Sequence, residues 1–379
     1  MRKALNIVII ISISALLSTC SREQTESVFP KTVKIEKHQK QLVLADNKLG
    51  FDIYKNVSQT DKQNSNILIS PINLNKSLGF LLHNSKNNRN IKLLLRLSNL
   101  QRETICSEIN KLNDILFNID KQSIFKNTTS FETNEQIDFG KDFKDFVSSN
   151  NIKIKSYSKN SYISNNKPNT QAFNLNNEIS FKYNYKFQTG VTESPFYLNP
   201  DESIFVKTLI CESEFNFYSD DILKAIEVPL GRGNFNSLII LPEADQSIKS
   251  IKNKLSQFYV NKMNKKFRKL NISAYLPQLD INYSSKLNNP LEKRGLRNLF
   301  DSRSPEFINI SKDKELYLEE FSQLVSLKTI SKPVSKNTLF DTNNESKNIF
   351  LVDRPFLMVI TEKFTGAILF MGQITNPNE

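Results

Sequence analysis

The chain has 379 residues, enough for one large domain or two of average size, and no linker interrupts the pattern after Leu42. Its net charge of +12 comes from lysine spread over the whole length, so composition does not indicate a nucleic-acid partner. The cysteines and histidines show no metal-ligand spacing and no histidine accompanies a G-x-S-x-G pattern, so neither an enzyme nor a cofactor is expected.

The first forty residues have the pattern of an export signal followed by a spacer. A basic start precedes the apolar run 5–17, which is too short to span a membrane and leads into Leu-Ser-Thr-Cys, ending at Cys20. This pattern resembles a bacterial lipobox with Thr19 in place of the usual Gly, Ala or Ser. Residues 1–19 are therefore predicted to be a lipoprotein signal peptide and Cys20 the lipidated residue; the alternative is ordinary secretory cleavage nearby.

Residues 20–40 are polar and predict a flexible tether, so that the folded domain covers residues 41–379. With a lipid on Cys20, the protein is expected on the cell envelope of a bacterium, at the outer membrane or the cell surface. With ordinary cleavage it is expected to be secreted.

The first part of the domain predicts helices and one short strand. Apolar residues recur at helical spacing over residues 42–57, 74–82 and 105–119. A short strand, residues 66–70, precedes the second helix and is stopped by a proline. The second helix ends near His83, which is typical of a helix-end histidine close to the last carbonyls.

The middle of the chain predicts strands separated by one polar gap. Residues 152–157 alternate like a strand, whereas the segment between Tyr157 and Phe173 is polar and is predicted to be a loop. Cys106 lies on a predicted helix and Cys211 at a predicted strand end. If Cys20 carries a lipid, these two are expected to be free thiols in the core.

Later segments predict two hairpins. Residues 225–229 and 237–242 are two strands joined by a turn at Gly231–Gly233, and a phosphate loop is not expected there because no helix follows. Residues 356–360 and 367–371 are apolar runs joined by 363–366, which predicts a C-terminal hairpin buried on both faces.

Several short words in this part of the chain resemble those of the serpins. They are Glu-Val-Pro and Ser-Leu-Ile-Ile-Leu-Pro in the first hairpin, and Asp-Arg-Pro-Phe from Asp353, Phe-Met-Gly from Phe370 and Asn-Pro from Asn376 in the C-terminal part. The resemblance implies an α+β fold with a large mixed sheet, further sheets that carry the C-terminal hairpin, and surrounding helices. It also implies an exposed reactive-centre loop ahead of that hairpin, as bait for a serine or a cysteine peptidase.

The resemblance also points to a buried polar cluster, called the shutter in this family. Ser70 and Asn177 fall on shutter positions and match the family residues. Asn73 stands where the family has a second serine, and Gln323 replaces the shutter histidine. Tyr185 stands where the family has a tryptophan, and its hydroxyl needs a partner if it is buried.

The hinge departs from the pattern of inhibitory serpins, in which a glycine and several alanines precede the bait. This chain reads Ser331-Lys332-Pro333-Val334-Ser335, so a proline without an N–H donor replaces the glycine. Lys336 occupies an alanine position, and Phe340 is large where small residues are needed to enter a sheet. We therefore expect insertion of the loop to be slow or absent.

The position of the bait bond and the function are each left with two alternatives. Counting forward from the hinge places the bond at Lys347-Asn348, which suits a trypsin-like peptidase, and counting back from Phe350 moves it toward Asn344. The family resemblance implies a peptidase inhibitor that acts by loop insertion. The hinge residues imply a non-inhibitory relative that uses the same fold as a binding or structural surface for an unknown protein ligand.

One cluster breaks the even distribution of lysine, within residues 262–269. It consists of Lys262, Lys265, Lys266, Arg268 and Lys269, which surround two apolar residues. A solvated edge or turn is the interpretation we favour, and a patch for glycans, nucleic acid or anionic lipid is the alternative.

Overall fold

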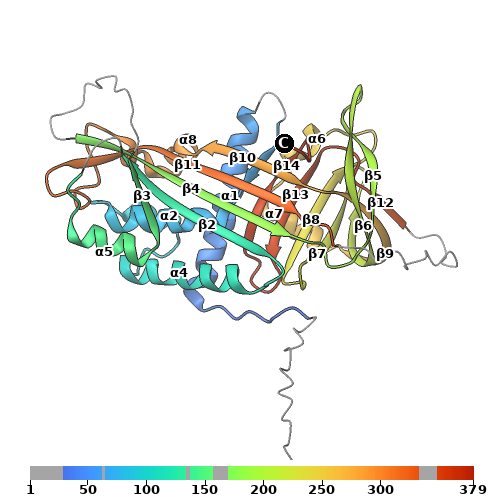
Figure 1. Cartoon of the computed structure of the whole chain (residues 1–379), viewed down its shortest axis with the longest axis horizontal. Coiled ribbons are helices and arrows are strands. Elements are labelled where there is room, and N and C mark those ends of the chain that lie inside the picture. The colour runs from blue at the N-terminus through green and yellow to red at the C-terminus, as the bar shows by residue number, and fades with distance from the viewer. Residues whose placement is uncertain (1–28, 62–64, 134–136, 157–169, 333–347) are drawn as a thin grey trace, which may run out of the picture.

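A computed structural model describes residues 29–61, 65–133, 137–156, 170–332 and 348–379. Two β-sheets and a set of helices make up this part of the chain (Figure 1). The five-stranded sheet lies on the left of the view with α2, α4 and α5 below it, and the strands β5, β6, β9 and β12 stand at the right.

The five-stranded sheet is mixed and has the strand order β10-β11-β4-β2-β3. Its strands are β2 (Ile124–Thr133), β3 (Ile152–Ser156), β4 (Thr170–Tyr183), β10 (Asp280–Lys286) and β11 (Glu315–Thr329). Buried and less buried residues alternate along β4, as expected for a strand with one face on the core. The other face carries polar side chains such as Asn176 and Lys182. The sheet therefore packs on the helices with one face only.

The nine-stranded sheet has the order β1-β14-β13-β8-β7-β6-β9-β12, with β5 paired to β6. Its strands are β1 (Ile67–Ile69), β5 (Gln188–Asn199), β6 (Glu202–Ser219), β7 (Leu223–Leu230), β8 (Phe235–Pro242), β9 (Arg268–Pro277), β12 (Asn348–Leu351), β13 (Phe356–Glu362) and β14 (Ile368–Ile374). The C-terminal strands β13 and β14 are buried almost throughout, so the predicted hairpin is confirmed.

The glycine of the Phe-Met-Gly motif, Gly372, has a structural reason. It pairs with Leu68 of β1, and a Cβ atom at this position would lie 1.8 Å from the carbonyl oxygen of Ile67. Only a residue without a side chain allows β1 to approach β14 this closely.

The helices pack around these sheets. They are α1 (Lys37–Thr60), α2 (Pro71–Asn84), α3 (Arg89–Leu94), α4 (Arg102–Asn118), α5 (Lys141–Ser149), α6 (Ile248–Lys252), α7 (Gln257–Asn264) and α8 (Asn288–Leu291), followed by single turns at Glu292–Leu296 and Arg297–Phe300. Helix α2 begins with Pro71 directly after Ser70, where a proline loses no helical hydrogen bond. It contacts β2, β4 and β14, so it is the helix that joins the two sheets. The α+β prediction is confirmed.

The predicted tether was wrong in its last part. Helix α1 already begins at Lys37. Upstream of it, the backbone N–H of Lys31 donates to Asn234 Oδ1 at 2.9 Å, and Asn234 Nδ2 donates to the carbonyl oxygen of Lys31 at 2.7 Å. Two hydrogen bonds fix this segment on the turn between β7 and β8, so it belongs to the domain. Within the described ranges, no helix is both long and apolar enough to cross a bilayer.

Two smaller predictions also need correction. The polar gap was predicted to be a loop up to Phe173, but β4 already starts at Thr170; residues 157–169 lie outside the described residues. Cys211 lies inside β6 instead of at a strand end, because β6 is far longer than its apolar run. Cys106 and Cys211 are both buried free thiols, as predicted. Burial raises the pKa of each thiol to about 12, which makes both unreactive.

Candidate functional site: the pairing of β4 and β11

Strands β4 and β11 are direct neighbours over their whole length. They pair in parallel, from Glu315 opposite Thr170 to Thr329 opposite Tyr183, with one irregularity after Leu318. Beyond the last pair, the N–H of Ile330 still donates to the carbonyl oxygen of Tyr183 at 2.6 Å. We call this contact the β4–β11 seam. A strand that entered the sheet here would have to replace every one of its backbone hydrogen bonds.

A row of buried polar side chains crosses the sheet at the middle of the seam. Gln323 of β11 lies opposite Asn177 of β4, and their outer neighbours are Ser285 of β10 and Thr129 of β2. All four are buried. Polar residues in register on four adjacent strands are unusual in a core, because each needs a hydrogen-bond partner.

Gln323 binds the start of helix α2. Its Oε1 accepts from the backbone N–H of Ser70 at 3.0 Å, and its Nε2 donates to the carbonyl oxygen of Ser70 and to Asn73 Oδ1, both at 2.9 Å. Asn73 Nδ2 donates onward to Asn127 Oδ1 of β2 at 2.7 Å. The amide thus supplies one acceptor and two donors at the position where the family has a histidine.

Asn177 binds the same helix one turn further on. Its Oδ1 accepts from Ser77 Oγ of α2 and, at 3.1 Å, from Thr129 Oγ1. Among the described residues, its Nδ2 has no hydrogen-bond partner, and neither has the hydroxyl of Ser70. Gln323 and Asn177 are therefore each attached to helix α2, so the two strands of the seam are anchored separately on one element.

The structure thus brings together all four predicted shutter residues, and it adds two that the sequence reasoning missed. Ser77 follows Ser70 and Asn73 at the spacing of one helix face, and this periodicity was the signal for it. Thr129 gave no signal, since its place is set by pairing with a strand distant in sequence.

The chain that leaves β11 is held by a side-chain amide. Gln188 Oε1 accepts from the backbone N–H of Lys332 at 2.9 Å, and Gln188 Nε2 donates to the carbonyl oxygen of Lys332 at 3.3 Å. Lys207 Nζ donates to the Ser331 hydroxyl at 3.2 Å, and burial lowers the pKa of Lys332. Gln188 was not predicted, because a lone glutamine in a polar stretch carries no sequence signal.

The rest of the predicted hinge and bait is outside the described residues. This applies to Pro333, Val334, Ser335, Lys336, Phe340 and Lys347. The chain is described again from Asn348, the first residue of β12, which pairs in parallel with β9. The Asn348 amide also donates to the carbonyl oxygen of Asn271 at 3.3 Å. The chain therefore leaves the five-stranded sheet after Thr329, reaches Gln188 of β5 at Lys332, and is described again from Asn348 in the nine-stranded sheet.

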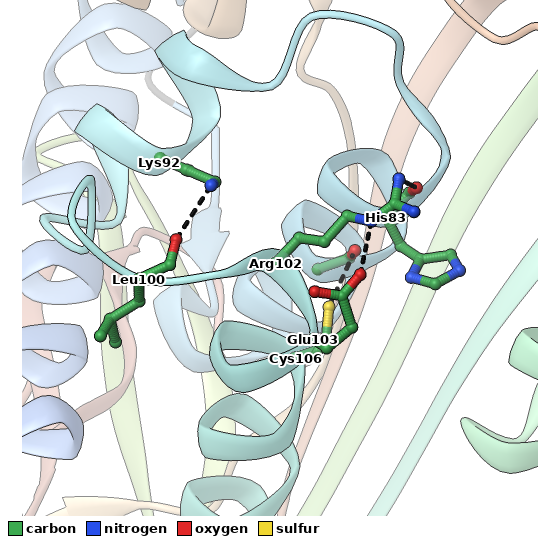
Figure 2. A network of polar contacts seen from close by, with 7 residues as sticks. His83, Lys92, Leu100, Arg102, Glu103 and Cys106 are labelled. Atoms are coloured by element: carbon green, nitrogen blue, oxygen red, sulfur yellow. Dashed lines mark hydrogen bonds and ion pairs between the residues drawn. The ribbon is translucent and has the colours of Figure 1, made fainter.

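His83 and the basic cluster within residues 262–269, both interpreted from the sequence as structural features, lie away from the seam. His83 lies in the last turn of α2 with its ring stacked on Phe146 at 4.0 Å, and burial lowers its pKa. Figure 2 shows Arg102 at the start of α4 donating to the carbonyl oxygen of His83 and pairing with Glu103, so this network joins two helix ends. The basic residues of 262–269 lie on α7, on the turn after it and on the first residues of β9.

A family model supports this architecture. The model for "Serpin (serine protease inhibitor)" matches residues 44–161 and 150–377, which is nearly the whole described chain. The chain belongs to the serpin family. Serpins in general inhibit peptidases and are not catalysts, although some are non-inhibitory, which agrees with the absence of a hydrolase pattern in the sequence.

Sequence relatives are distant. An uncharacterized serpin-like protein of Thermococcus kodakarensis is 26% identical over 215 residues, covering 54% of this chain and 50% of the relative. An alpha-1-antitrypsin homolog of Cyprinus carpio is 25% identical over 52% of this chain and 54% of the relative, and the leukocyte elastase inhibitor of Homo sapiens is 25% identical over 54% and 58%. The aligned part spans about half the length of the first of these relatives.

Solved structures agree in fold. Human thyroxine-binding globulin superposes with a TM-score of 0.76 at 18% identity, covering 90% of this chain and all of that one. Native protease nexin-1, solved with heparin, gives a TM-score of 0.74 at 20% identity over 89% of this chain and all of the other. At this identity the likeness concerns the serpin fold alone.

Proposed function

We propose that this serpin is an exported lipoprotein that offers residues 333–347 as bait to a trypsin-like serine peptidase. One observation carries the proposal, namely that β11 ends at Thr329 in the five-stranded sheet and β12 begins at Asn348 in the other sheet, while β4 and β11 are paired directly with each other. Among the described residues, no strand stands between β4 and β11, so the seam is closed. Lys347 remains our bait residue.

The length of this segment fits the seam. Strand β4 has 14 residues and β11 has 15. A cut after Lys347 would free the 15 residues from Pro333 onward, enough to run the length of β4, whereas a cut at Asn344 would free three fewer. One observation counts against a cut after Lys347. The backbone of Asn348 is paired with β9, so a peptidase must loosen the start of β12 to bind the Lys347–Asn348 bond.

Incubation with a trypsin-like peptidase tests the proposal. Denaturing electrophoresis followed by mass determination of the fragments should show a first cut within residues 333–347, with some of the peptidase joined covalently to the chain. First cuts elsewhere in the chain would refute the bait proposal. The fragment masses also show whether the cut follows Lys347; the alternative at Asn344 needs a peptidase that does not require lysine or arginine.

A second candidate is a non-inhibitory serpin that is cut in the loop without trapping its peptidase. It is supported by Pro333, which cannot donate a ladder hydrogen bond, and by the Gln188 amide that holds Lys332 at both backbone groups. For this candidate the same experiment gives clipped chain and no covalent adduct.

Export rests on the sequence of residues 1–20 and has its own test. Expression in a bacterium with a labelled fatty acid should label the wild type, and Cys20→Ser should abolish the label while leaving the chain exported or retained as a precursor. Label that persists in the variant would contradict lipidation at Cys20.

A further inference from the structure

The basic cluster that sequence analysis had set aside lies beside the strand into which the bait runs. β12 pairs in parallel with β9, with Asn348 opposite Ile272. β9 extends four residues further, from Arg268 to Asn271, which corresponds to about 13 Å of strand. Lys265 and Lys266 form the turn just ahead of it. Asn348, the first residue of β12, therefore lies toward the end of β9 that carries the cluster.

Aromatic rings connect this cluster with β12 itself. Phe350 is buried with its ring centre 6.4 Å from that of Phe217. Lys224 Nζ lies 5.5 Å from the centre of the Phe350 ring, and the Arg268 guanidinium lies 5.6 Å from that of Phe217. Lys224 and Arg268 thus stand over the rings of Phe350 in β12 and of its neighbour Phe217. We call Lys224, Lys262, Lys265, Lys266 and Arg268 the basic surface; Lys269, the next residue of β9, faces the other side of the sheet, where it pairs with Glu214.

Most of this charge is not neutralised by the chain itself. Lys269, on the other side of the sheet, pairs with Glu214 at 3.2 Å, and both side chains are more than half exposed, so this pair is weak. Among the described residues, Lys224, Lys265, Lys266 and Arg268 form no ion pair. Two carboxylates of the adjoining strands bind neutral groups instead of these cations, since Glu227 accepts from the Asn216 amide and Asp220 from the hydroxyls of Tyr218 and Tyr259.

We propose that the basic surface is a second docking surface for the target peptidase, and that it fits a carboxylate-rich area beside that enzyme's active-site cleft. The inference rests on the proposed bait function. A peptidase bound to a bond just ahead of Asn348 has to stand over this end of β9, where it meets the cations of the basic surface. Exposed charges next to a binding site act mainly by steering association.

The test compares charge reversal at two places. K265E/K266E changes exposed residues of the turn, and K293E/R297E makes the same change of charge in the turns that follow α8, an element that Figure 1 shows well to the left of β9. The mature chain is mixed with two trypsin-like peptidases, one of acidic and one of basic surface. The rate constant for loss of intact chain is measured at 0.05 M and 0.5 M NaCl, because it counts trapping and clipping together.

We expect K265E/K266E to slow the reaction with the acidic peptidase about tenfold at low salt and not to slow that with the basic one. The effect should fade at 0.5 M NaCl, where the screening length is about 4 Å. K293E/R297E should match the wild type. If melting curves show that K265E/K266E is not folded, K265Q/K266Q replaces it, with an expected loss of about threefold.

Equal rates for K265E/K266E and K293E/R297E would overturn the inference while leaving the bait function intact. So would an unchanged rate together with lost retention on heparin-agarose or on phosphatidylglycerol vesicles, since the surface would then serve a polyanion or a membrane. Failure of both peptidases to cut residues 333–347 in any variant would refute the bait function, and this inference with it.

Discussion

Gln323 forms the hydrogen bonds of the buried shutter cluster with an amide, where the family has an imidazole. Its amide accepts one hydrogen bond and donates two, and the backbone groups of Ser70 depend on two of these. The sequence alone predicted that Gln323 belongs to the shutter, because it stands at the position of the family's shutter histidine. Its partners could not be predicted, because they depend on how α2 lies under the sheet.

Truncating Gln323 should therefore destabilise the fold strongly. Gln323→Ala leaves the N–H and the carbonyl of Ser70 buried without partners, and we expect the free energy of unfolding to fall by about 3 kcal/mol. Ser326→Ala, on the outer face of the same strand, is the control and should change little. Urea denaturation of both variants measures the difference; equal losses would mean that the shutter bonds add no stability.

Asp46 is a second buried group whose chemistry can be tested. It lies on α1, accepts at 3.0 Å from the Asn75 amide of α2, and Asn113 of α4 donates to Asn75 at 3.1 Å. Burial raises the pKa of the Asp46 carboxyl well above its usual range. No sequence pattern indicates this network, since each member is an ordinary polar residue of a different helix.

The raised pKa of Asp46 makes stability depend on pH with a defined sign. As pH rises above 4, the unfolded chain releases the proton first, so the free energy of unfolding falls by up to about 1.4 kcal/mol per pH unit until the folded pKa is reached. Asp46→Asn cannot ionise and should flatten this slope, whereas Asp114→Asn, an exposed change on α4, should retain it. Melting temperatures between pH 4 and pH 8 provide the measurement.

At the scale of elements, Lys332 and Asn348 border the proposed bait and are held in different ways. Two hydrogen bonds from one side chain hold Lys332, whereas a paired strand holds Asn348. On the proposed function, insertion would have to release the first residue, and peptidase binding would have to loosen the second. A proline at position 333 would then oppose the start of a new strand, because it lacks an N–H donor.

Replacing the unfavourable hinge residues should favour trapping. In P333G/K336A a backbone N–H is restored and a side-chain ammonium is removed from the part of the chain that would enter the sheet. We expect the ratio of covalent adduct to clipped chain, measured by denaturing electrophoresis, to rise severalfold over the wild type. An unchanged ratio would show that these two residues do not limit insertion.

At the scale of the whole molecule, cleavage tests whether the seam can open. An inserted strand would gain hydrogen bonds to both β4 and β11. We therefore expect cleaved P333G/K336A to melt well above its uncut form, and the cleaved wild type to rise less. Calorimetry before and after limited proteolysis measures this shift. A melting temperature that is unchanged in both proteins would mean that the seam stays closed and that the fold serves as a scaffold.

The sequence predicted the architecture better than the contacts within it. The C-terminal hairpin, helix α2 and the strand at Asn177 followed from periodicity and from words such as Phe-Met-Gly, because burial imposes those patterns locally. The position of the basic surface beside β12 did not follow, because it depends on a parallel pairing between residues 348 and 272. The prediction of a flexible tether was wrong around Lys31 for a similar reason, because Lys31 is held by Asn234, which lies 203 positions further along the chain.

Strand β14 lies between β1 and β13, so this seven-residue strand is an interior member of its sheet. A chain truncated before Ile368 would leave the inner edges of both neighbours open to water. Unpaired strand edges of this kind are templates for pairing with another chain. Loss of β14 should therefore turn a monomeric sheet into an aggregating one.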